Sequence, residues 1–354
     1  MEHSETTREL LITHCKTYPN LQIQDIFKFL HQSAFGCEHF VSSLCTATSF
    51  IAEEYRGLRD KKATYIEPLD GDYSRVPLSY IDRGLSAETL GRLFVASSKQ
   101  EPNGMSVLLE KLKVAKQLVY EGLLPFSEEE FDEAMQKWKN QGYDALHHSD
   151  IFKASYRPAY RVINNRFIPF LPLLAELDKR LKNGRVILSV EGGSASGKTT
   201  LSEMLYGLYD CTVFHMDDFF LQPHQRTPER FAQVGGNIDW ERFLSEVLIP
   251  LSKGEPVSYR KFDCSAMSLT EEIQVTPKRF TVIEGAYSMH PSLEKYYDLS
   301  VYLDIAPSLQ RERILHRNSP ELAQRFFNEW IPLERRYFSE THAEQRCSMT
   351  IQIL

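Results

Sequence analysis

Apolar residues in the first half of the chain recur at the spacing of one face of an α-helix. One stripe begins near Leu21 and comprises Ile23, Ile26, Phe27, Leu30 and Ala34. A second precedes Gly122, a residue suited to a helix C-terminus, and comprises Leu108, Leu109, Leu112, Ala115, Leu118 and Val119. Residues three and four apart lie on the same side of a helix, so each stripe predicts a helix packed against a core.

Shorter signals extend the helical pattern. Ser127 and Glu130 form a capping-box pattern, which predicts a third helix through Trp138. Prolines and a glycine interrupt residues 65–77, which favours a loop with at most a short hairpin. The region up to about residue 178 is therefore expected to be mostly α-helical.

The pattern changes after the charged stretch LDKRLKNGR at residues 177–185, which is typical of a helix end followed by a linker. Five short apolar runs rich in β-branched residues follow, at residues 186–190, 211–216, 280–283, 299–305 and 348–353. Uninterrupted runs of this length are typical of buried parallel strands, and helical-period segments lie between them. We therefore predict a mostly helical domain at residues 1–178 and an α/β domain at residues 179–354.

Composition and charge narrow the classes of function. The chain has 354 residues, and its 41 basic and 48 acidic side chains give a net charge of -7. This charge opposes broad binding to nucleic acid or to an anionic membrane, and no apolar run approaches the ~20 residues of a membrane span. The N-terminus has no secretory pattern, so we expect a cytoplasmic protein with a small-molecule substrate. A homo-oligomer is left open.

A phosphate-binding pattern lies directly after the first of the five apolar runs. The segment GGSASGKTT has the form G-x-x-x-x-G-K-T and precedes a helical pattern. Backbone N–H groups of such a loop turn inward around phosphate oxygens, and the following helix directs its positive end to the same anion. The expected nucleotide-binding residues are Gly192, Gly193, Ser194, Ala195, Ser196, Gly197, Lys198, Thr199 and Thr200.

These residues predict ATP and Mg²⁺ as cofactors. Lys198 is expected to reach the β- and γ-phosphates, and the Thr199 hydroxyl is expected to bind Mg²⁺. The alternative is a glycine-rich turn that only caps a helix. It is less favoured because the strand, the loop, the Lys-Thr pair and the helix all occur in register.

Carboxylates follow the next two apolar runs, at the sheet edge where open α/β folds bind their ligands. Asp217 and Asp218 stand in HMDDFF, where a carboxylate can accept the proton of a hydroxyl nucleophile. Glu284 stands in TVIEGAYS, the position of an acid that holds Mg²⁺ directly or through water. The alternatives are surface-loop acids for the pair and a buried structural acid for Glu284.

Five motifs, in order, carry a resemblance to a known family. GGSASGKTT, HMDDFF, GGNIDWERF, VIEGAYS and RERILHRN resemble the uridine kinase and phosphoribulokinase family of P-loop kinases. The resemblance covers about residues 185–354 and implies an α/β P-loop NTPase fold with a parallel five-stranded sheet of order 2-3-1-4-5. It implies a phosphotransferase that moves the γ-phosphoryl of ATP to a primary hydroxyl of a small molecule.

The resemblance also implies roles for single residues. Asp217 matches the family's catalytic base and acts there with Lys198. Asp239 in GGNIDWERF matches an acid that holds acceptor hydroxyls. The family's lid arginines, which close over the phosphates, resemble Arg311, Arg313 and Arg317, and of these Arg313 and Arg317 are the expected nucleotide contacts.

The sequence departs from nucleoside kinases where they recognise the acceptor. Phe262, Asp263 and Cys264 stand roughly where a Tyr-Asp pair would contact the substrate, so the expected acceptor is a nucleoside-like or other hydroxylated metabolite. Arg226 is a further candidate acceptor contact, suited to an acidic or phosphorylated group.

Two polar patches distinguish the N-terminal region, which the resemblance does not cover. HQSAFGCEHF contains Glu38 and His39, and HHSDIFKASYRPAYRVI contains His147, His148, Tyr156, Arg157, Tyr160 and Arg161. These side chains are candidates for one polar site, for packing at a domain interface, or, with Cys37, for a metal site. We expect a domain that selects the substrate or regulates the kinase.

Two other functions remain alternatives to the small-molecule kinase. A nucleotide sensor with weak ATPase activity would need phosphate and Mg²⁺ ligands but no base such as Asp217. A nucleoside monophosphate kinase would cradle an acceptor phosphate with arginines such as Arg226 and Arg230. Asp239 argues against an anionic group at that position.

Overall fold

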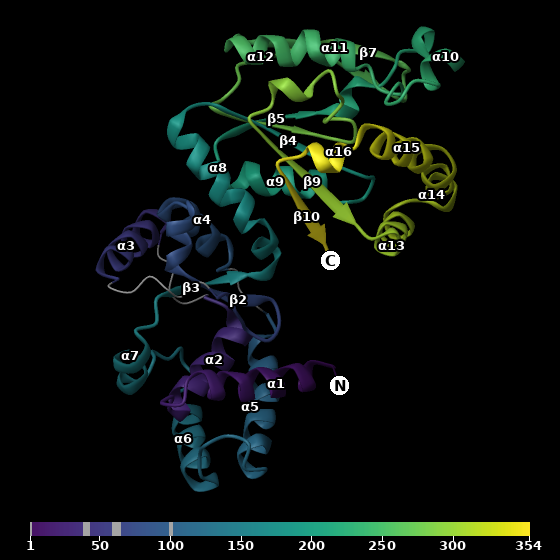
Figure 1. The fold of residues 1–354 in the computed structure, drawn as a ribbon. Coiled ribbons are helices and arrows are strands. Elements are labelled where there is room, and N and C mark those ends of the chain that lie inside the picture. Colours follow the sequence, from purple (N-terminus) through teal and green to yellow (C-terminus); the bar gives the residue numbers. More distant parts are fainter. Residues whose placement is uncertain (1, 38–42, 59–64, 99–101) are drawn as a thin grey trace. The chain divides into compact units, whose positions relative to one another are not determined.

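The computed structural model describes residues 2–37, 43–58, 65–98 and 102–354. The chain divides into two compact units, Met1–Ala175 and Glu176–Leu354 (Figure 1). Helix α8 (Leu171–Asn183) carries the chain across this division and ends inside the charged stretch at residues 177–185. Among the described residues, no helix is long and apolar enough to cross a membrane.

The first unit is mainly helical, as the sequence predicts. Its helices are α1 (Glu2–Thr17), α2 (Ile23–Phe35), α3 (Leu44–Gly57), α4 (Ala87–Ala96), α5 (Gly104–Tyr120), α6 (Glu128–Asn140) and α7 (Asp150–Tyr156). The two predicted apolar stripes lie on α2 and α5, and the Ser127–Glu130 capping box opens α6. One residue of the α5 stripe was placed wrongly, because Leu109 is 39% exposed while Leu108 and Leu112 are buried.

A small antiparallel sheet crosses this helical unit. Strands β1 (Glu67–Pro68) and β2 (Tyr73–Pro77) form the short hairpin that the sequence allowed, and β3 (Tyr160–Asn164) pairs with β2. The sequence analysis did not predict β3. This strand begins with the polar pair Tyr160–Arg161 and has only two buried apolar residues, Val162 and Ile163, so its apolar pattern is weak. All five residues of β2 are buried, including Arg75, so this strand carries a charge into the interior.

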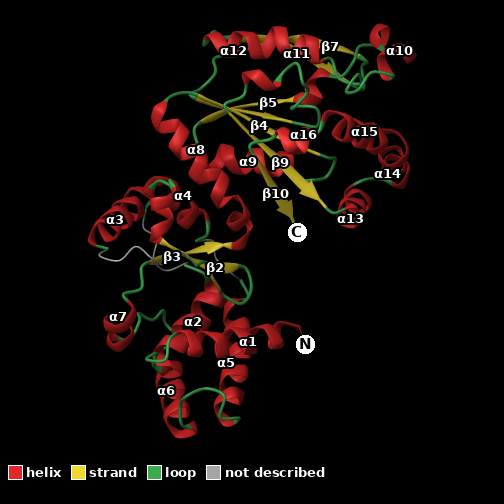
Figure 2. Cartoon of the chain, in the orientation of Figure 1, coloured by secondary structure: helices red, strands yellow, loops and turns green. Residues whose placement is uncertain are grey.

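The second unit holds a parallel five-stranded sheet. Its strands are β4 (Val186–Gly192), β5 (Cys211–His215), β8 (Phe280–Glu284), β9 (Leu299–Ile305) and β10 (Met349–Ile353). Their order is β10-β9-β4-β8-β5, which confirms the predicted order 2-3-1-4-5. Figure 2 shows helices on both sides of the sheet. Apolar residues dominate β4 and β8, and every position of both strands is buried.

The second unit also contains a series of further helices and a hairpin. They include α9 (Lys198–Leu208), α10 (Pro228–Phe231), α11 (Trp240–Phe243), α12 (Ile249–Lys253), α13 (Pro307–Arg317), α14 (Pro320–Arg325), α15 (Ile331–Thr341) and α16 (Ala343–Arg346). An antiparallel hairpin, β6 (Val257–Asp263) and β7 (Ser268–Val275), was not predicted. Its apolar positions alternate with exposed ones, and Tyr259 stacks on Phe219, so only one face of the hairpin joins the core.

Candidate active site

The segment between β4 and α9 has the geometry of a phosphate-binding loop. Gly192 has φ 150° and its backbone approaches β9 so closely that a Cβ there would lie 2.7 Å from the Leu303 carbonyl oxygen. Gly197 has φ 95° and ends the loop directly before Lys198. Positive φ values at these two positions favour glycine and let the loop curl around an anion at the start of α9. The Lys198 ammonium donates to the Gly193 carbonyl at 3.0 Å.

The predicted Mg²⁺ residues meet at the end of β8. The Thr199 hydroxyl donates to Glu284 Oε1 at 3.4 Å, and the same oxygen lies 2.5 Å from His215 Nδ1. Glu284 is only 6% exposed. The hydrogen bond to Glu284 raises the pKa of His215 above its ordinary value. His215 was missed by the sequence analysis, although it begins the HMDDFF motif that supplied Asp217.

The two aspartates of that motif have different surroundings. The Asp218 carboxylate is ion-paired with Lys261 at 3.0 Å. Asp217 is accessible to solvent and accepts no hydrogen bond from the residues that the structure describes. Neighbouring protein atoms reduce the hydration of its carboxylate without covering it, which raises the pKa of Asp217. The charge of Lys198 opposes this shift, and the negative charge of Glu284 adds to it. Asp217 thus lies within electrostatic range of both Lys198 in the phosphate loop and Glu284, a predicted Mg²⁺ ligand.

Only one of the three lid arginines contacts the phosphate loop. Arg313 donates to the Ala195 carbonyl at 3.3 Å. Arg311 lies over the Phe327 ring at 4.5 Å, and Arg317 lies over the Phe326 ring at 5.4 Å. Such stacking holds a guanidinium in place through its planar face. In this conformation Arg317 is held on an aromatic side chain rather than on the loop.

Two buried glutamates that the sequence analysis did not single out hold the loop in place. Glu334 on α15 accepts from the Ser194 backbone N–H at 2.9 Å and from the Ser194 hydroxyl at 2.5 Å. Glu191 accepts backbone N–H groups of Gly192 and Met289 at 2.9 Å each. Burial raises the pKa of Glu191 to about 7, and these hydrogen bonds oppose the shift. Glu191 adjoins the phosphate motif in sequence, whereas no local signal marks Glu334.

The residues expected at the acceptor site are partly engaged with the protein itself. Asp239 caps α11 by accepting the Arg242 N–H at 3.2 Å, and it accepts from Gln225 at 2.8 Å. Arg230 forms a two-pronged ion pair with Glu241, at 2.6 and 2.7 Å. Arg226 is exposed, with its guanidinium 5.4 Å from the centre of the Phe262 ring. Of these, Arg226 is the most accessible to a ligand.

Sequence comparison finds relatives among curated uridine kinases. The uridine kinase of Brevibacillus brevis is 26% identical over 145 residues, which are 38% of this chain and 67% of that protein. The uridine kinase of Geobacillus kaustophilus is 27% identical over 150 residues, 40% of this chain and 71% of that protein. Uridine kinase-like protein 5 of Arabidopsis thaliana is 27% identical over 153 residues, 40% of this chain and only 32% of that protein. No family model matches the chain.

Solved structures show weaker likenesses. A candidate uridine kinase from Bacillus stearothermophilus has 20% identity and a TM-score of 0.37, covering 50% of this chain and 99% of that one. A candidate fructose transport system kinase from Silicibacter sp. TM1040 has 24% identity and a TM-score of 0.40, covering 47% and 89%.

The strand order, the phosphate loop and the sequence relatives together define the class of the second unit. It is a uridine kinase-like P-loop kinase region. The relatives match about 40% of the chain.

Proposed function

We propose that the protein is an ATP-dependent kinase that transfers the γ-phosphoryl group to a hydroxyl of a nucleoside-like or other small hydroxylated metabolite. The observation that carries this proposal is the position of Asp217. Its carboxylate follows β5, lies in the field of Lys198 and Glu284, and accepts no hydrogen bond from the described part of the chain. A phosphate loop that only sensed nucleotide would have no use for such a free base.

The neighbouring residues fit ATP with Mg²⁺. Backbone N–H groups of the loop after Gly192 and the start of α9 suit the phosphates, and Lys198 suits the transferred group. Thr199 and Glu284 offer oxygen ligands for Mg²⁺, which keeps several waters and binds few protein groups. Among the described residues, no cluster of three or more His, Cys, Asp or Glu side chains is suited to a metal, so phosphate oxygens and water would supply the remaining ligands.

Asp217 would act as the base in the transfer. The acceptor hydroxyl oxygen forms a bond to the γ-phosphorus, the bond from that phosphorus to the β–γ bridging oxygen breaks to leave ADP, and the hydroxyl proton passes to the Asp217 carboxylate. The raised pKa of Asp217 suits this role, because a carboxylate with a higher proton affinity is a stronger base.

An acceptor that already bears a phosphate is less well supported. Arg230, one of the two arginines that would hold such a group, is occupied by Glu241. Buried Asp239 also contributes a negative charge where the acceptor is expected. These contacts favour a neutral polyol over a nucleoside monophosphate.

A screen of acceptors tests the proposed activity. The full-length protein, ATP and Mg²⁺ would be incubated with nucleosides, sugars, vitamins, hydroxy acids and hydroxy amino acids, and products would be weighed by mass spectrometry. One acceptor that gains the mass of one phosphate supports the kinase and identifies its substrate. If ATP binds and no acceptor reacts, the nucleotide sensor becomes the better explanation.

The first unit would serve the kinase by selecting its substrate or regulating it. A truncated chain that starts at Leu181 tests this role once the acceptor is known. We expect the truncated protein to bind ATP and to lose acceptor selectivity or regulation. Unchanged kcat and KM for every acceptor, in a truncated protein whose circular dichroism shows a folded α/β unit, would refute the role.

A further inference from the structure

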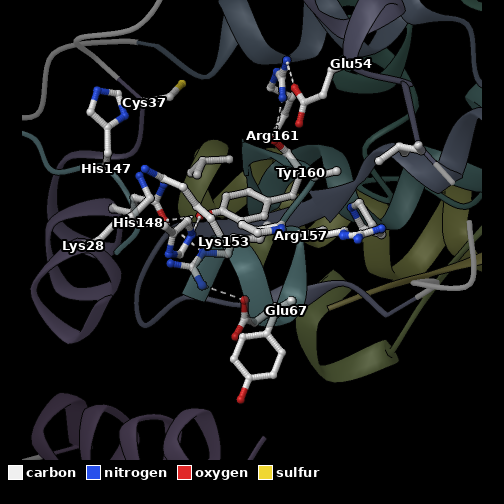
Figure 3. A pocket seen from close by; sticks show the side chains of 18 of the residues that line it. Lys28, Cys37, Glu54, Glu67, His147, His148, Lys153, Arg157, Tyr160 and Arg161 are labelled. Carbon is white, nitrogen blue, oxygen red and sulfur yellow. Dashed lines mark hydrogen bonds and ion pairs between the residues drawn. The ribbon is translucent and has the colours of Figure 1, made fainter. Parts of the chain in front are cut away.

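A large cavity lies within the first unit, far in sequence from the phosphate loop. It encloses about 1600 Å³ and is lined from α2, α3, β2, α7 and β3 (Figure 3). Both polar patches noted in the sequence contribute to it, through Cys37 from one and His147, His148, Tyr156, Arg157, Tyr160 and Arg161 from the other. Glu38 and His39, which belong to the same prediction, lie outside the described residues. The cavity is the polar site on which these segments converge.

Arg75 is a buried cation in the wall of this cavity. It is 2% exposed, donates through Nε to Gln32 at 2.9 Å, and is ion-paired through Nη1 with Glu67 at 2.8 Å. Its guanidinium also lies 4.8 Å from the centre of the Tyr160 ring. The third nitrogen, Nη2, has no hydrogen-bond partner among the described residues. An unsatisfied buried donor on a charged group is costly, so an anion that reached this nitrogen, which has less than 1 Å² of exposed surface, would satisfy it.

A hydrogen-bond chain fixes the wall beside Arg75. Asp25 accepts from His148 Nδ1 at 2.9 Å, and the Tyr160 hydroxyl lies 2.6 Å from His148 Nε2. Hydrogen bonds hold the pKa of Asp25 at about 2, so it is ionised and the proton between it and His148 resides on Nδ1. The Tyr160 hydroxyl therefore donates to Nε2. This chain orders Tyr160 over Arg75 before any ligand arrives, which reduces the entropy lost on binding.

The described residues that line the cavity include both cations and carboxylates. Lys28, Arg75, Lys153, Arg157 and Arg161 line it together with Glu53, Glu54 and Glu67, and Lys153 is ion-paired with Asp150 at 3.1 Å. Two of these carboxylates are already ion-paired, Glu67 with Arg75 and Glu54 with Arg161 at 2.9 Å. Figure 3 shows Lys153, Arg157 and Tyr160 around the same space. Arg157 has no ion-pair partner among the described residues, and this exposed cation favours an anionic ligand.

Arg157 is held in an unusual backbone conformation at this site. Its φ of 45° is left-handed, and Pro158 follows it, which disfavours helical conformations at the preceding residue. Such strain costs about 1–3 kcal/mol and persists where the surrounding structure requires it. Here it ends α7 and places an exposed guanidinium at the cavity, where the described residues offer it no ion-pair partner.

Aromatic side chains form much of the remaining wall. Phe152 is buried and stacks on His148 at 4.2 Å, and Phe50, Phe94 and Tyr156 also line the space. Planar apolar surfaces next to cations suit a ligand with an aromatic body and a negative group. We propose that this cavity binds a small organic anion, with its carboxylate or phosphate on Arg157 and beside Arg75, and its aromatic body against Tyr156.

Calorimetry with defined probes tests the proposal. Full-length protein carrying Lys198→Ala would be titrated with benzoate, phenyl phosphate and neutral phenol, because that background weakens anion binding at the phosphate loop. We expect the two anions to bind at least about fivefold more tightly than phenol, since one charge contact of about 1 kcal/mol corresponds to that ratio. Benzoate and phenyl phosphate distinguish a carboxylate ligand from a phosphate ligand.

Variants then locate the binding. Arg157→Asn removes the guanidinium, keeps a residue that tolerates left-handed φ, and should weaken the anions about fivefold or more. Arg75→Met removes the buried guanidinium and should also weaken binding of the anions. Because this change leaves Glu67 without its ion-pair partner, circular dichroism must first show that the variant is folded. Lys137→Ala, on an exposed position of α6 away from the cavity, is the matched control and should bind normally. Absence of binding by both anions, or equal binding by Arg157→Asn and the control, would overturn the proposal.

Discussion

We propose anion sites at the phosphate loop and in the cavity of the first unit, and the chain builds these two places in opposite ways. The loop comes from one continuous segment, Gly192–Thr200, whose backbone N–H groups are the proposed ligand contacts. The cavity joins side chains that are far apart in sequence, since Gln32 and Arg75 are separated by 43 positions and Asp25 and His148 by 123. A site built from the backbone of one segment is recognisable as a short motif in the sequence. A site built from side chains of distant segments corresponds only to residues scattered along the sequence.

The comparison also teaches how each site should respond to change. Glycines in the loop are fixed by backbone geometry, and only a few side chains such as Lys198 and Asp217 are proposed to take part in the reaction. In the cavity, the buried Arg75 belongs to both the proposed binding surface and the fold, because its partners Gln32 and Glu67 are largely buried with it. Substitutions at the proposed reacting residues of the second unit should therefore change activity without changing the free energy of unfolding. Substitutions in the cavity of the first unit should change both ligand binding and the free energy of unfolding.

The sharpest test of that separation is Lys198→Ala. We expect phosphoryl transfer to fall by about 10³-fold or more, because the Lys198 ammonium is the proposed contact to the transferred group. Urea unfolding should change by less than about 1 kcal/mol, since the side chain makes only one loop contact. Lys253→Ala, on an exposed lysine at the end of α12, is the matched control. Substantial turnover in Lys198→Ala would remove the loop from the reaction.

Asp217→Asn should have the next largest effect. Asparagine keeps the size of the side chain and removes the base, so kcat should fall by about 10²–10⁴-fold while ATP still binds. Asp218→Asn is the control on the neighbouring residue, whose carboxylate pairs with Lys261. Its effect on kcat should be far smaller. Equal losses in the two variants would mean that the motif is needed for folding rather than for proton transfer.

Much of the second unit was predictable from sequence because its signals are local. The apolar runs gave all five strands, and the loop motif identified Gly192, Lys198 and Thr199. The hairpin β6–β7 was missed because only one of its faces is buried, which leaves a broken apolar pattern. Glu334 was missed because its partner Ser194 lies 140 residues away. Contacts of that kind exist only once the chain has folded.

The first unit shows the same limit more strongly. Helices α2 and α5 follow from their apolar stripes and α6 from its capping box, but β3 was missed because of the polar residues at its start. The unusual residues around His147 and Arg157 were noticed as a group, and packing at a domain interface was favoured for them over a binding site. The cavity and the buried Arg75 in its wall become visible only in the folded structure. Nothing in the sequence around Arg75 indicates that this arginine is buried.

Arg75→Met should lower the unfolding free energy of the first unit and leave that of the second unit unchanged. Removing this guanidinium leaves Glu67 buried without its main counter-ion, which should cost about 3 kcal/mol. Protonation of His14, which lies 2.7 Å from Glu67, would recover part of that loss at low pH. Arg92→Met removes only a surface pair with Glu88 and should cost less than about 1 kcal/mol. Urea unfolding, with ATP binding as a probe of the second unit, measures both.

ATP binding decides whether the units respond independently. If Arg75→Met unfolds the first unit at a lower urea concentration while ATP binding persists to the wild-type midpoint, stability in the two units is separate. Simultaneous loss of both signals would show that the units unfold together. A loss no larger than that of Arg92→Met would mean that Glu67 finds another counter-ion.

The smallest expected effect is a shift in the pKa of Asp217, the proposed base. Asp217 must be ionised to accept a proton, so kcat/KM should fall as the pH drops through its pKa, and this acid limb should lie above the ordinary aspartate value because the pKa is raised. The negative charge of Glu284 contributes to that increase. Glu284→Gln should therefore lower the pKa of Asp217 and move the limb to lower pH, by less than about one unit.

The quantity to measure is the pH at which the acid limb of the kcat/KM profile lies, not the height of that profile. Glu284→Gln should also weaken Mg²⁺ binding and slow the reaction at every pH, which changes the height. Saturating Mg²⁺ keeps that loss constant across the titration. Glu203→Gln, on an exposed position of α9, changes the net charge equally and should leave the limb in place. A limb that stays fixed in Glu284→Gln, or moves to higher pH, would show that it reports a group other than Asp217.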